Sequence, residues 1–229
     1  NDTATTEIYT SLFVGSVDVY KEGLEGSSIR LVPLSLTHLD NLCVIGLEPQ
    51  LWRATTIHIQ TKADMERYVR TALDAQSGGT ALPFAIVERA SGVIVGTTRF
   101  HSMVPEHKRL EIGFTWIASP WQRTFVNTEA KFLMLQHAFE AWECIRVEFR
   151  ADAENEQSCR ALLRIGARQE GILRSYRVSP LRGIRDLAVF SIIASEWSQV
   201  RLMLEEKLKK QPNQAPEPTI TAVTPRAIV

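Results

Sequence analysis

The residues with the clearest chemical potential lie between positions 110 and 130, where a strand-like run, LEIGFTWIA, leads through a proline-containing loop into a helix-like run. Gln122, Arg123 and Thr124 stand just before that helix and supply polar and cationic donors. The first N–H groups of a helix have no partner within it, and the helix dipole adds positive charge, so this arrangement favours an anion. An ordinary strand-to-helix turn with a surface arginine fits the same residues, because every helix has a positive end.

A second polar pair, Asn155 and Ser158, stands at the start of a later predicted helix, after the strand-like run RVEFRAD. Asn is a preferred N-cap and Ser is common in a first turn, so a structural role explains both residues. A functional role requires the Asn155 amide to turn toward a ligand instead.

Periodicity and capping signals predict the elements that position these residues. Alternating or β-rich runs predict strands over residues 28–33, 82–88, 93–103, 109–118, 146–151, 170–177 and 184–194. Predicted helices follow Thr37, run from Thr61 to Gly78, cover 128–142 with Asn127 as the cap, run from Asn155 to Gly166, and begin at Ser195. This order predicts a mixed α/β fold: an antiparallel meander, a β-α-β crossover and a closing hairpin.

Composition is that of an ordinary globular protein, with 45% hydrophobic and 23% charged residues. The formal net charge is zero, which disfavours a strongly basic nucleic-acid binder. No run approaches the ~18 apolar residues of a membrane-spanning helix. We expect one domain over residues 24–208, a lead-in over 1–23 that is either a short edge strand or a loose segment, and a flexible proline-rich tail over 209–229.

The three cysteines, Cys43, Cys144 and Cys159, are widely spaced and form no C-x-x-C pair. Free buried thiols in a reducing compartment are the expectation, and neither a metal site nor a cysteine nucleophile is predicted. The polar N-terminus has no basic region of a secretory signal, so the prediction is a cytoplasmic protein.

The order of elements and four short motifs resemble the GNAT superfamily of acyl-CoA-dependent N-acyltransferases, in particular the branch with the ribosomal-protein-alanine N-acetyltransferases. The likeness covers residues 24–200. The motifs are Gln122 with Thr128, Glu129 and Ala130; Asn155 with Ser158; Gly166 and Ala167 with Glu170 and Gly171; and Arg185 and Asp186 with Ser191, Glu196 and Trp197. Phe125 and Asn127 depart from the pattern, since they replace small residues that let backbone amides approach phosphate.

The resemblance implies a splayed, mostly antiparallel central sheet flanked by helices, with acetyl-CoA as co-substrate. The strands near residues 110–118 and 146–151 would part, and the pantetheine arm would enter the gap. Asn155 would reach this arm, and Ser158 would face the thioester. Backbone groups of Phe114, Thr115, Trp116, Ile117 and Ala118 would pair with the arm like an added strand. The pyrophosphate would rest beside Gln122 on the amides of Arg123, Thr124, Phe125, Val126, Asn127 and Thr128.

The implied reaction is direct attack of a neutral amine in a ternary complex, so a base must take the proton of the ammonium. Glu111 is the first candidate. Strand alternation places Ile112 and Phe114 toward the core, so Glu111 should face the acceptor cleft, on the side of Asn155 and Ser158, with a raised pKa. A surface carboxylate paired with a neighbouring cation is the alternative; its partner would be Arg109 or Lys108.

The remaining candidates surround this assignment. His101 and His107 rank below Glu111 as bases. Many relatives use a tyrosine as proton donor where this chain has Leu163, so Ser158 or water would protonate the thiolate. Trp52 and Arg53 lie where relatives build the acceptor pocket, although Trp52 also fits a core position.

The identity of the acceptor stays open among a peptide N-terminus, a polyamine, an aminoglycoside and a small metabolite amine. No nucleic-acid or membrane partner is predicted, and a homodimer is left open. The non-glycine loop and the missing tyrosine also leave open a degenerate, non-catalytic domain that binds a CoA-like ligand or a protein partner.

Overall fold

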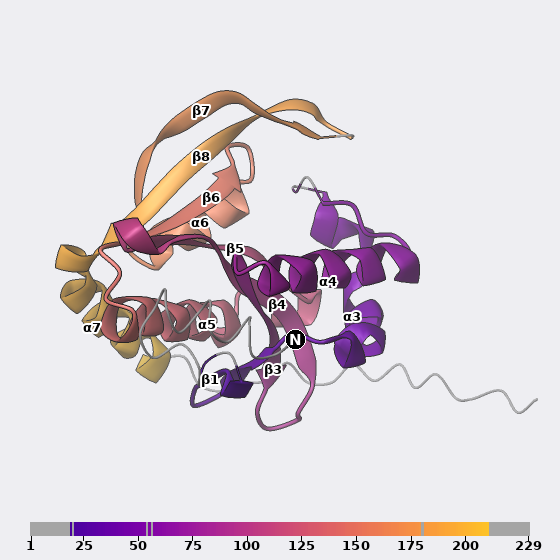
Figure 1. The fold of residues 1–229 in the computed structure, drawn as a ribbon, viewed down its shortest axis with the longest axis horizontal. Helices are drawn as coiled ribbons and strands as arrows, with labels where there is room; N and C mark the ends of the chain where they lie inside the picture. The colour runs from indigo at the N-terminus through magenta and orange to yellow at the C-terminus, as the bar shows by residue number, and fades with distance from the viewer. Residues whose placement is uncertain (1–18, 20, 54, 56, 180, 211–229) are drawn as a thin grey trace, which may run out of the picture.

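The computed structural model describes residues 19, 21–53, 55, 57–179 and 181–210, and its fold is shown in Figure 1. The strands are β1 (Leu24–Glu25), β2 (Ile29–Pro33), β3 (Ala81–Glu88), β4 (Ile94–Val104), β5 (Arg109–Ile117), β6 (Arg146–Asp152), β7 (Arg168–Ser179) and β8 (Gly183–Ile193). The α-helices are α3 (Leu39–Gly46), α4 (Lys62–Ser77), α5 (Phe125–Gln136), α6 (Glu156–Arg164) and α7 (Ala194–Lys210). Short helical turns are η1 (Leu36–His38), η2 (Pro49–Trp52), η3 (Pro105–His107), η4 (Ser119–Trp121) and η5 (His137–Ala141), the last a π-type extension of α5.

The strands form one eight-stranded sheet in the order β1-β2-β3-β4-β5-β6-β8-β7. Neighbouring strands are antiparallel except β5 and β6, which are parallel. The mixed α/β, mostly antiparallel prediction is therefore confirmed. The parallel pair is where the chain crosses over through α5, as a parallel connection requires.

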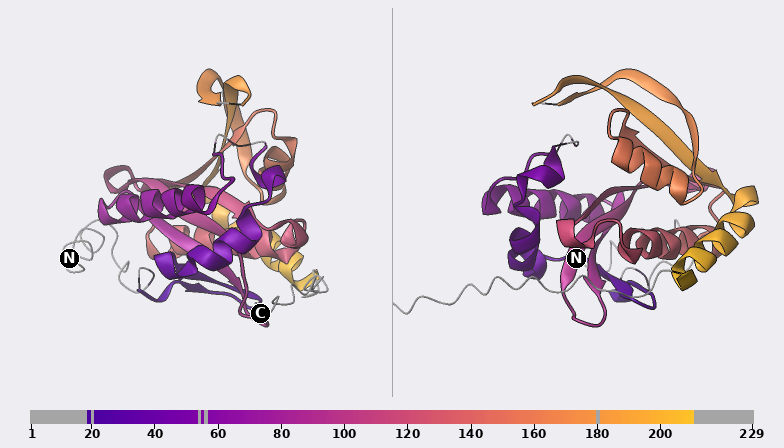
Figure 2. Two further views of the ribbon diagram at one scale, coloured as in Figure 1. Left: turned by 90° about the vertical axis from the view of Figure 1, so that its right-hand side faces the viewer. Right: turned by 180° about the vertical axis from the view of Figure 1, so that it is seen from behind.

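Helices cover both faces of this sheet, with α3 and α4 on one face and α5 and α7 on the other (Figures 1 and 2). Two hydrophobic clusters correspond to these faces. Residues of β3 alternate between them: Phe84 and Ile86 join the α5 cluster, and Ala85 and Val87 join the α4 cluster. This is the pattern of a strand buried on both sides.

Capping explains where several helices begin, and it corrects two predictions. The Thr61 hydroxyl accepts from Asp64 N, and α4 ends before Gly78 as expected. However, α5 begins at Phe125 because Thr124 is its cap, with its hydroxyl accepting from Val126 N at 3.3 Å. Asn127 lies within the first turn, so its assignment as cap is wrong. Thr37 lies inside η1 and caps no helix either.

A β-bulge interrupts the alternation of β5. The register between β4 and β5 shifts between Thr97 and Arg99, and Phe114 opposite has a φ of 50°, in the left-handed region. Ile112 is buried in the core, but Phe114 is 42% exposed. The prediction that both side chains face the core is therefore wrong for Phe114, because the bulge turns it out of the core.

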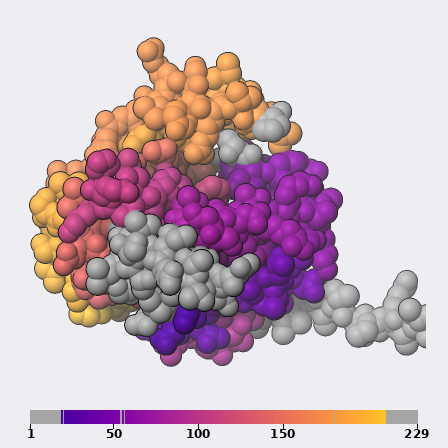
Figure 3. All heavy atoms as spheres, in the orientation of Figure 1, coloured from indigo at the N-terminus to yellow at the C-terminus, as the bar shows by residue number. Residues whose placement is uncertain are grey.

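The β7–β8 hairpin leaves the body of the sheet and arches over the face that carries α4 (Figures 1 and 3). Its register shifts between Leu173 and Arg177, and Ser175 has a φ of 50°. The Asp186 carboxylate holds this bend by accepting from Ser175 N at 2.8 Å. The hairpin places the Tyr176 hydroxyl of β7 beside Arg150 of β6, which donates to it at 3.2 Å.

Most of the predicted lead-in, residues 1–18 and 20, and the tail from residue 211 lie outside the described residues. Helix α7 runs to Lys210, slightly beyond the predicted domain end. The three cysteines are free thiols, of which only Cys144 is fully buried. Burial raises the pKa of Cys144 to about 12.

Candidate active site

A gap opens between β5 and β6. The two strands pair only at Arg109↔Arg146, Leu110↔Val147 and Glu111↔Glu148. Beyond Glu111 the β6-facing edge of β5 has no strand partner among the described residues. A free strand edge can pair with an extended ligand, so the gap has the form that the pantetheine arm would need.

Part of the edge predicted to bind this arm already has partners. The Phe114 carbonyl accepts from the Tyr68 hydroxyl at 3.3 Å. The Ile117 carbonyl accepts from the Gln122 amide at 3.0 Å, and Ala118 N donates to Val95 O at 2.8 Å. An extended ligand would therefore use the remaining peptide groups of residues 112–116. Among these, Trp116 points its side chain into the α4 cluster.

The N-terminus of α5 faces the end of the gap. Its first-turn amides include those of Phe125, Asn127 and Thr128, whereas Val126 N is taken by the Thr124 cap. The Phe125 side chain turns inward: it is 3% exposed and packs edge-on against Trp121. The bulky residue in a glycine position therefore lies in the core and does not fill the loop. Arg123, with a φ of 63°, is exposed beside these amides.

The N-terminus of α6 borders the same loop. The Asn155 side chain caps α6 by accepting from Ser158 N at 3.1 Å, which is the structural role that the sequence allowed. Gln157 in the first turn donates to the Gln122 side chain at 3.1 Å. Gln122 therefore links the end of β5 to α6, and two helix N-termini flank the region where a pyrophosphate group is predicted.

Two other residues of the family motifs have structural partners. Glu129 is 2% exposed, and its carboxylate accepts from Ser28 N and from the Ser27 hydroxyl. It therefore joins α5 to the β1–β2 turn. Arg185 of β8 pairs with Asp152 at the end of β6 at 2.9 Å, and this contact anchors the β7–β8 hairpin to the sheet.

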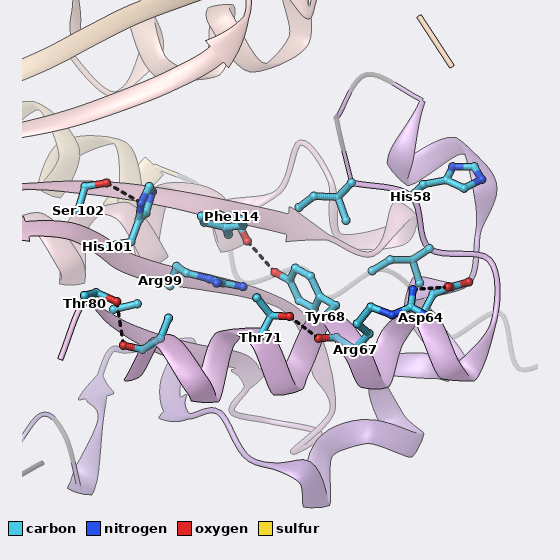
Figure 4. Close-up of a pocket in the computed structure, with 14 residues that line it drawn as sticks. His58, Asp64, Arg67, Tyr68, Thr71, Thr80, Arg99, His101, Ser102 and Phe114 are labelled. Carbon is cyan, nitrogen blue, oxygen red and sulfur yellow. Dashed lines mark hydrogen bonds and ion pairs between the residues drawn. The ribbon is translucent and has the colours of Figure 1, made fainter. Parts of the chain in front are cut away.

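On the opposite face, a cavity of about 530 Å³ lies between α4 and strands β4 and β5 (Figure 4). Its volume is within the range of small-molecule sites. The polar and aromatic lining includes Tyr68, Arg99, His101 and Phe114. Arg53 and Trp52 do not line this cavity. Trp52 is 3% exposed and packs against Trp116 in the core.

His101 and Glu111 meet where this cavity approaches the gap. The two residues are register partners on β4 and β5, and His101 Nε2 lies 3.4 Å from Glu111 Oε1. Burial would raise the pKa of Glu111, but contact with His101 and the positive charges of Arg150 and Arg177 outweigh it and lower that pKa. The prediction of a raised pKa is therefore wrong, and Glu111 is a carboxylate at neutral pH.

The hairpin adds a residue that the sequence did not mark. Arg150 Nε lies 3.3 Å from Glu111 Oε2, and Arg150 Nη1 donates to the Tyr176 hydroxyl at 3.2 Å. Tyr176 comes from β7, which arches over β6. Nothing in the local sequence places it there, because its position depends on the curvature of the hairpin. His107 lies in η3 and is not part of the cavity lining.

Glu111 does not share a face of the sheet with α6. On β6, Phe149 and Ala151 pack in the cluster that contains Leu162 of α6, so alternation points Arg150 to the other face. Glu111 pairs with Arg150 and belongs to that other face. The expected placement on the side of Asn155 and Ser158 is therefore wrong. Glu111 lies on one face of the sheet, and Asn155 and Ser158 lie on the other. They can contact the same ligand only if that ligand passes through the gap between β5 and β6, which opens directly after Glu111.

Among the described residues, no cluster of three or more His, Cys, Asp or Glu side chains is arranged to hold a metal ion. Within the same part of the chain, no helix has the length and apolarity needed to cross a bilayer.

The fold is that of a known family. Residues 28–168 match the family described as the acetyltransferase (GNAT) domain, and the chain belongs to this family. The predicted family membership is thereby confirmed.

Three relatives illustrate the similarity. The uncharacterized N-acetyltransferase p20 of Bacillus licheniformis is 26% identical over 178 residues, which cover 77% of this chain and 99% of the relative. A GCN5-related N-acetyltransferase from Brucella melitensis superimposes with a TM-score of 0.74 at 30% identity, covering 81% of this chain and 84% of that one. Mycobacterium smegmatis RimJ, solved in complex with CoA-disulfide, shares the fold with a TM-score of 0.67 at 24% identity, covering 78% of this chain and 88% of that one.

Proposed function

We propose that this GNAT acetyltransferase transfers the acetyl group of acetyl-CoA to a primary amine bound in the cavity beside α4, by direct attack in a ternary complex. The observation that carries the proposal is the position of the His101–Glu111 pair. Glu111 is the last residue paired across β5 and β6, and His101 lines the cavity. The pair thus lies where the gap and the cavity meet.

The residues around the gap fit acetyl-CoA, which supplies an acetyl group activated as a thioester. The unpaired edge of β5 would hold the pantetheine arm. The first-turn amides of α5 and the Arg123 guanidinium would hold the pyrophosphate, because both favour an anion. Asn155 and Ser158 would border the arm from α6.

The amine attacks only when it is neutral, so the chain must take a proton from the incoming ammonium. We assign this step to the His101–Glu111 pair. His101 faces the cavity, while Glu111 is 4% exposed and does not line it. The Glu111 carboxylate stabilises positive charge on the imidazole, and it orients the ring as carboxylates commonly do for a catalytic histidine.

Two hydroxyl groups of the site can donate a proton to the leaving thiolate. Ser158 lies in the first turn of α6. Tyr176 is held above β6 by Arg150, the residue that also contacts Glu111. Leu163, at the position of the tyrosine in relatives, is 52% exposed and apolar, and it has no proton to give.

Two measurements test this function. Calorimetric titration with CoA should give binding, and thiol release from acetyl-CoA should depend on an added amine. At a CoA concentration of ~100 times Kd, linkage predicts about 2.7 kcal/mol of added stability. Binding without amine-dependent release would favour the non-catalytic alternative. No binding at millimolar CoA would overturn both proposals for the gap.

A further inference from the structure

Arg99 is a buried cation that has no role in the acetyl transfer described above. It lies in the middle of β4, is 5% exposed, and is the one arginine that is buried among residues 19, 21–53, 55, 57–179 and 181–210. Over the same ranges its guanidinium has no carboxylate partner, and its side chain makes no hydrogen bond. Its ring contacts are with Phe114, at 3.9 Å from guanidinium carbon to ring centroid, and with Tyr68, at 5.2 Å.

Other partly buried arginines of this chain are paired with carboxylates. Arg146 pairs with Glu148 and Glu170, and Arg185 pairs with Asp152. Burying a charge without a partner is costly, because the lost hydration is not replaced. A guanidinium that remains unpaired in a cavity wall is therefore suited to an anion that arrives with a ligand.

The environment of Arg99 leaves its donors available for such an anion. Phe114 and Tyr68 contact the guanidinium as rings, which fixes the side chain through cation–π attraction. Figure 4 shows Arg99 extending from β4 toward Tyr68, with Phe114 above it, and all three residues line the cavity. Stacking uses the flat face of a guanidinium, and its N–H groups point outward along the edge. A carboxylate fits that edge with two parallel hydrogen bonds.

Among the described residues that line the cavity, Asp64 has the one carboxylate, and it does not compete for Arg99. Asp64 lies at the start of α4, where its carboxylate accepts from Thr61 N and from the Thr61 hydroxyl, and it pairs with Arg67 at 3.1 Å. These contacts satisfy Asp64 within α4. The lining hydroxyls of Thr71 and Thr80 donate to backbone carbonyls of Arg67 and Ala75. Apolar side chains of the same wall include Ile57, Ile59, Ala75 and Ala81.

The spacing of Arg99 and His101 sets the size of the ligand. The two residues are two positions apart on β4, so their side chains leave the same face of the strand. Both contact Phe114, whose ring centroid lies 3.9 Å from the Arg99 guanidinium carbon and 4.9 Å from the centroid of the His101 ring. One small ligand can therefore reach both groups, with its amino group and its carboxylate on a short skeleton.

We propose that the acceptor is a free amino acid with an apolar side chain. Its carboxylate binds Arg99, its amino group lies at the His101–Glu111 pair, and its side chain contacts the apolar wall. This inference rests on the proposed function, because it names the acceptor of the same transfer. The atoms balance as in any N-acetylation: the ammonium gives one proton to His101, the neutral nitrogen forms the C–N bond, and the C–S bond breaks. The second nitrogen proton is released as the amide forms, and the CoA thiolate takes up a proton and leaves as the free thiol.

The kinetic test compares acceptors that differ only at the carboxylate. Wild-type protein is assayed with leucine, leucine amide, isoamylamine and a dipeptide with N-terminal leucine. We expect kcat/KM for leucine to exceed that for each of the other three at least about tenfold, since a charged hydrogen-bonded pair is lost. Leucine amide and isoamylamine lack the carboxylate, and the dipeptide carries it one residue further from the amine. In Arg99→Met the KM for leucine should rise at least about tenfold, whereas the KM for isoamylamine should change little. Arg70→Met is the matched control, because Arg70 is an exposed arginine of α4 that pairs with Glu66 and does not line the cavity.

A binding measurement separates this proposal from the proposed function. Calorimetric titration of leucine into the CoA-bound protein should show binding that Arg99→Met weakens and Arg70→Met does not. Equal transfer to leucine and leucine amide, with CoA bound, would overturn the amino-acid acceptor and leave the acetyltransferase standing. A preference for the dipeptide would identify a peptide N-terminus instead. If Arg99→Met does not fold, Arg99→Lys replaces it: it keeps the charge but loses the planar fork, so the preference for leucine should fall while isoamylamine stays unaffected.

Discussion

His101 Nε2 lies 3.4 Å from Glu111 Oε1, and the residue that makes room for this contact is Gly113. Gly113 follows Glu111 by two positions on the same face of β5. A Cβ atom built on Gly113 would lie 2.5 Å from His101 Nε2, well inside contact distance. The absence of a side chain at this position therefore allows the imidazole to reach the carboxylate.

Replacing Gly113 should consequently separate the pair. We expect Gly113→Ala to push the His101 ring aside and to lower kcat at least about tenfold, with a smaller change in KM, because misplaced proton transfer affects the chemical step. Steady-state kinetics measure both parameters. Gly171→Ala is the control, because a Cβ there meets nothing within 4 Å. Unchanged kcat in Gly113→Ala would show that catalysis does not depend on the contact.

Glu111→Gln tests the carboxylate itself. The sequence named Glu111 as the base, and the structure places it behind His101, so loss of its charge should lower kcat about 10²-fold or more. CoA affinity should stay the same. Glu106→Gln, an exposed carboxylate in η3, serves as control. A normal kcat in Glu111→Gln would remove the carboxylate from the mechanism.

The sequence predicted the fold well because most elements carry local signals. Thr61 and Asn155 cap α4 and α6 as expected, and the strict alternation of β6 is observed. The start of α5 was misplaced because Thr124 and Asn127 are both good caps. Burial of Phe125 and Val126 decides between them, since both side chains reach the core only if the helix includes them. That choice depends on tertiary packing, which no local signal reports.

The site was harder to predict because its contacts cross between strands. The pairing of His101 with Glu111 follows from the β4–β5 register. A bulge shifts that register next to the site, and its left-handed position is occupied by Phe114, so no glycine in the sequence signals it. The same bulge brings Phe114 over Arg99. A charged residue in the otherwise uncharged strand run IVGTTRF was a visible anomaly, and it could have marked Arg99 as functional.

The cap assignment leads to different expected stability losses for substitutions of Thr124 and Asn127. Thr124→Ala should destabilise the protein by about 1 kcal/mol, because it removes the hydroxyl that accepts from Val126 N. Asn127→Gly should cost less, about 0.3 kcal/mol, because Asn127 is not the cap and glycine has only a slightly lower helix propensity than asparagine. Neither change should alter CoA affinity more than a few fold, because both leave the other first-turn amides in place. Urea unfolding and calorimetry measure the two quantities. CoA binding at least tenfold tighter in Asn127→Gly would show that the asparagine side chain obstructs the loop.

Lys131 gives the stability of this protein a pH dependence with a defined sign. It is 3% exposed on α5 and donates to the hydroxyls of Thr98 and Thr115, and burial lowers its pKa from 10.5 to about 7. Between these two values the unfolded chain binds more protons than the folded one, so the free energy of unfolding rises as pH increases from about 7 toward 10.5. Lys131→Met removes the group. The variant should therefore be more stable than the wild type at neutral pH, and the difference should shrink as the pH rises through this window. Urea unfolding across the window measures it, with Lys62→Met as control, because Lys62 is exposed and paired with Asp40. A stability difference that stays constant with pH would show that the Lys131 ammonium is not desolvated in the folded protein.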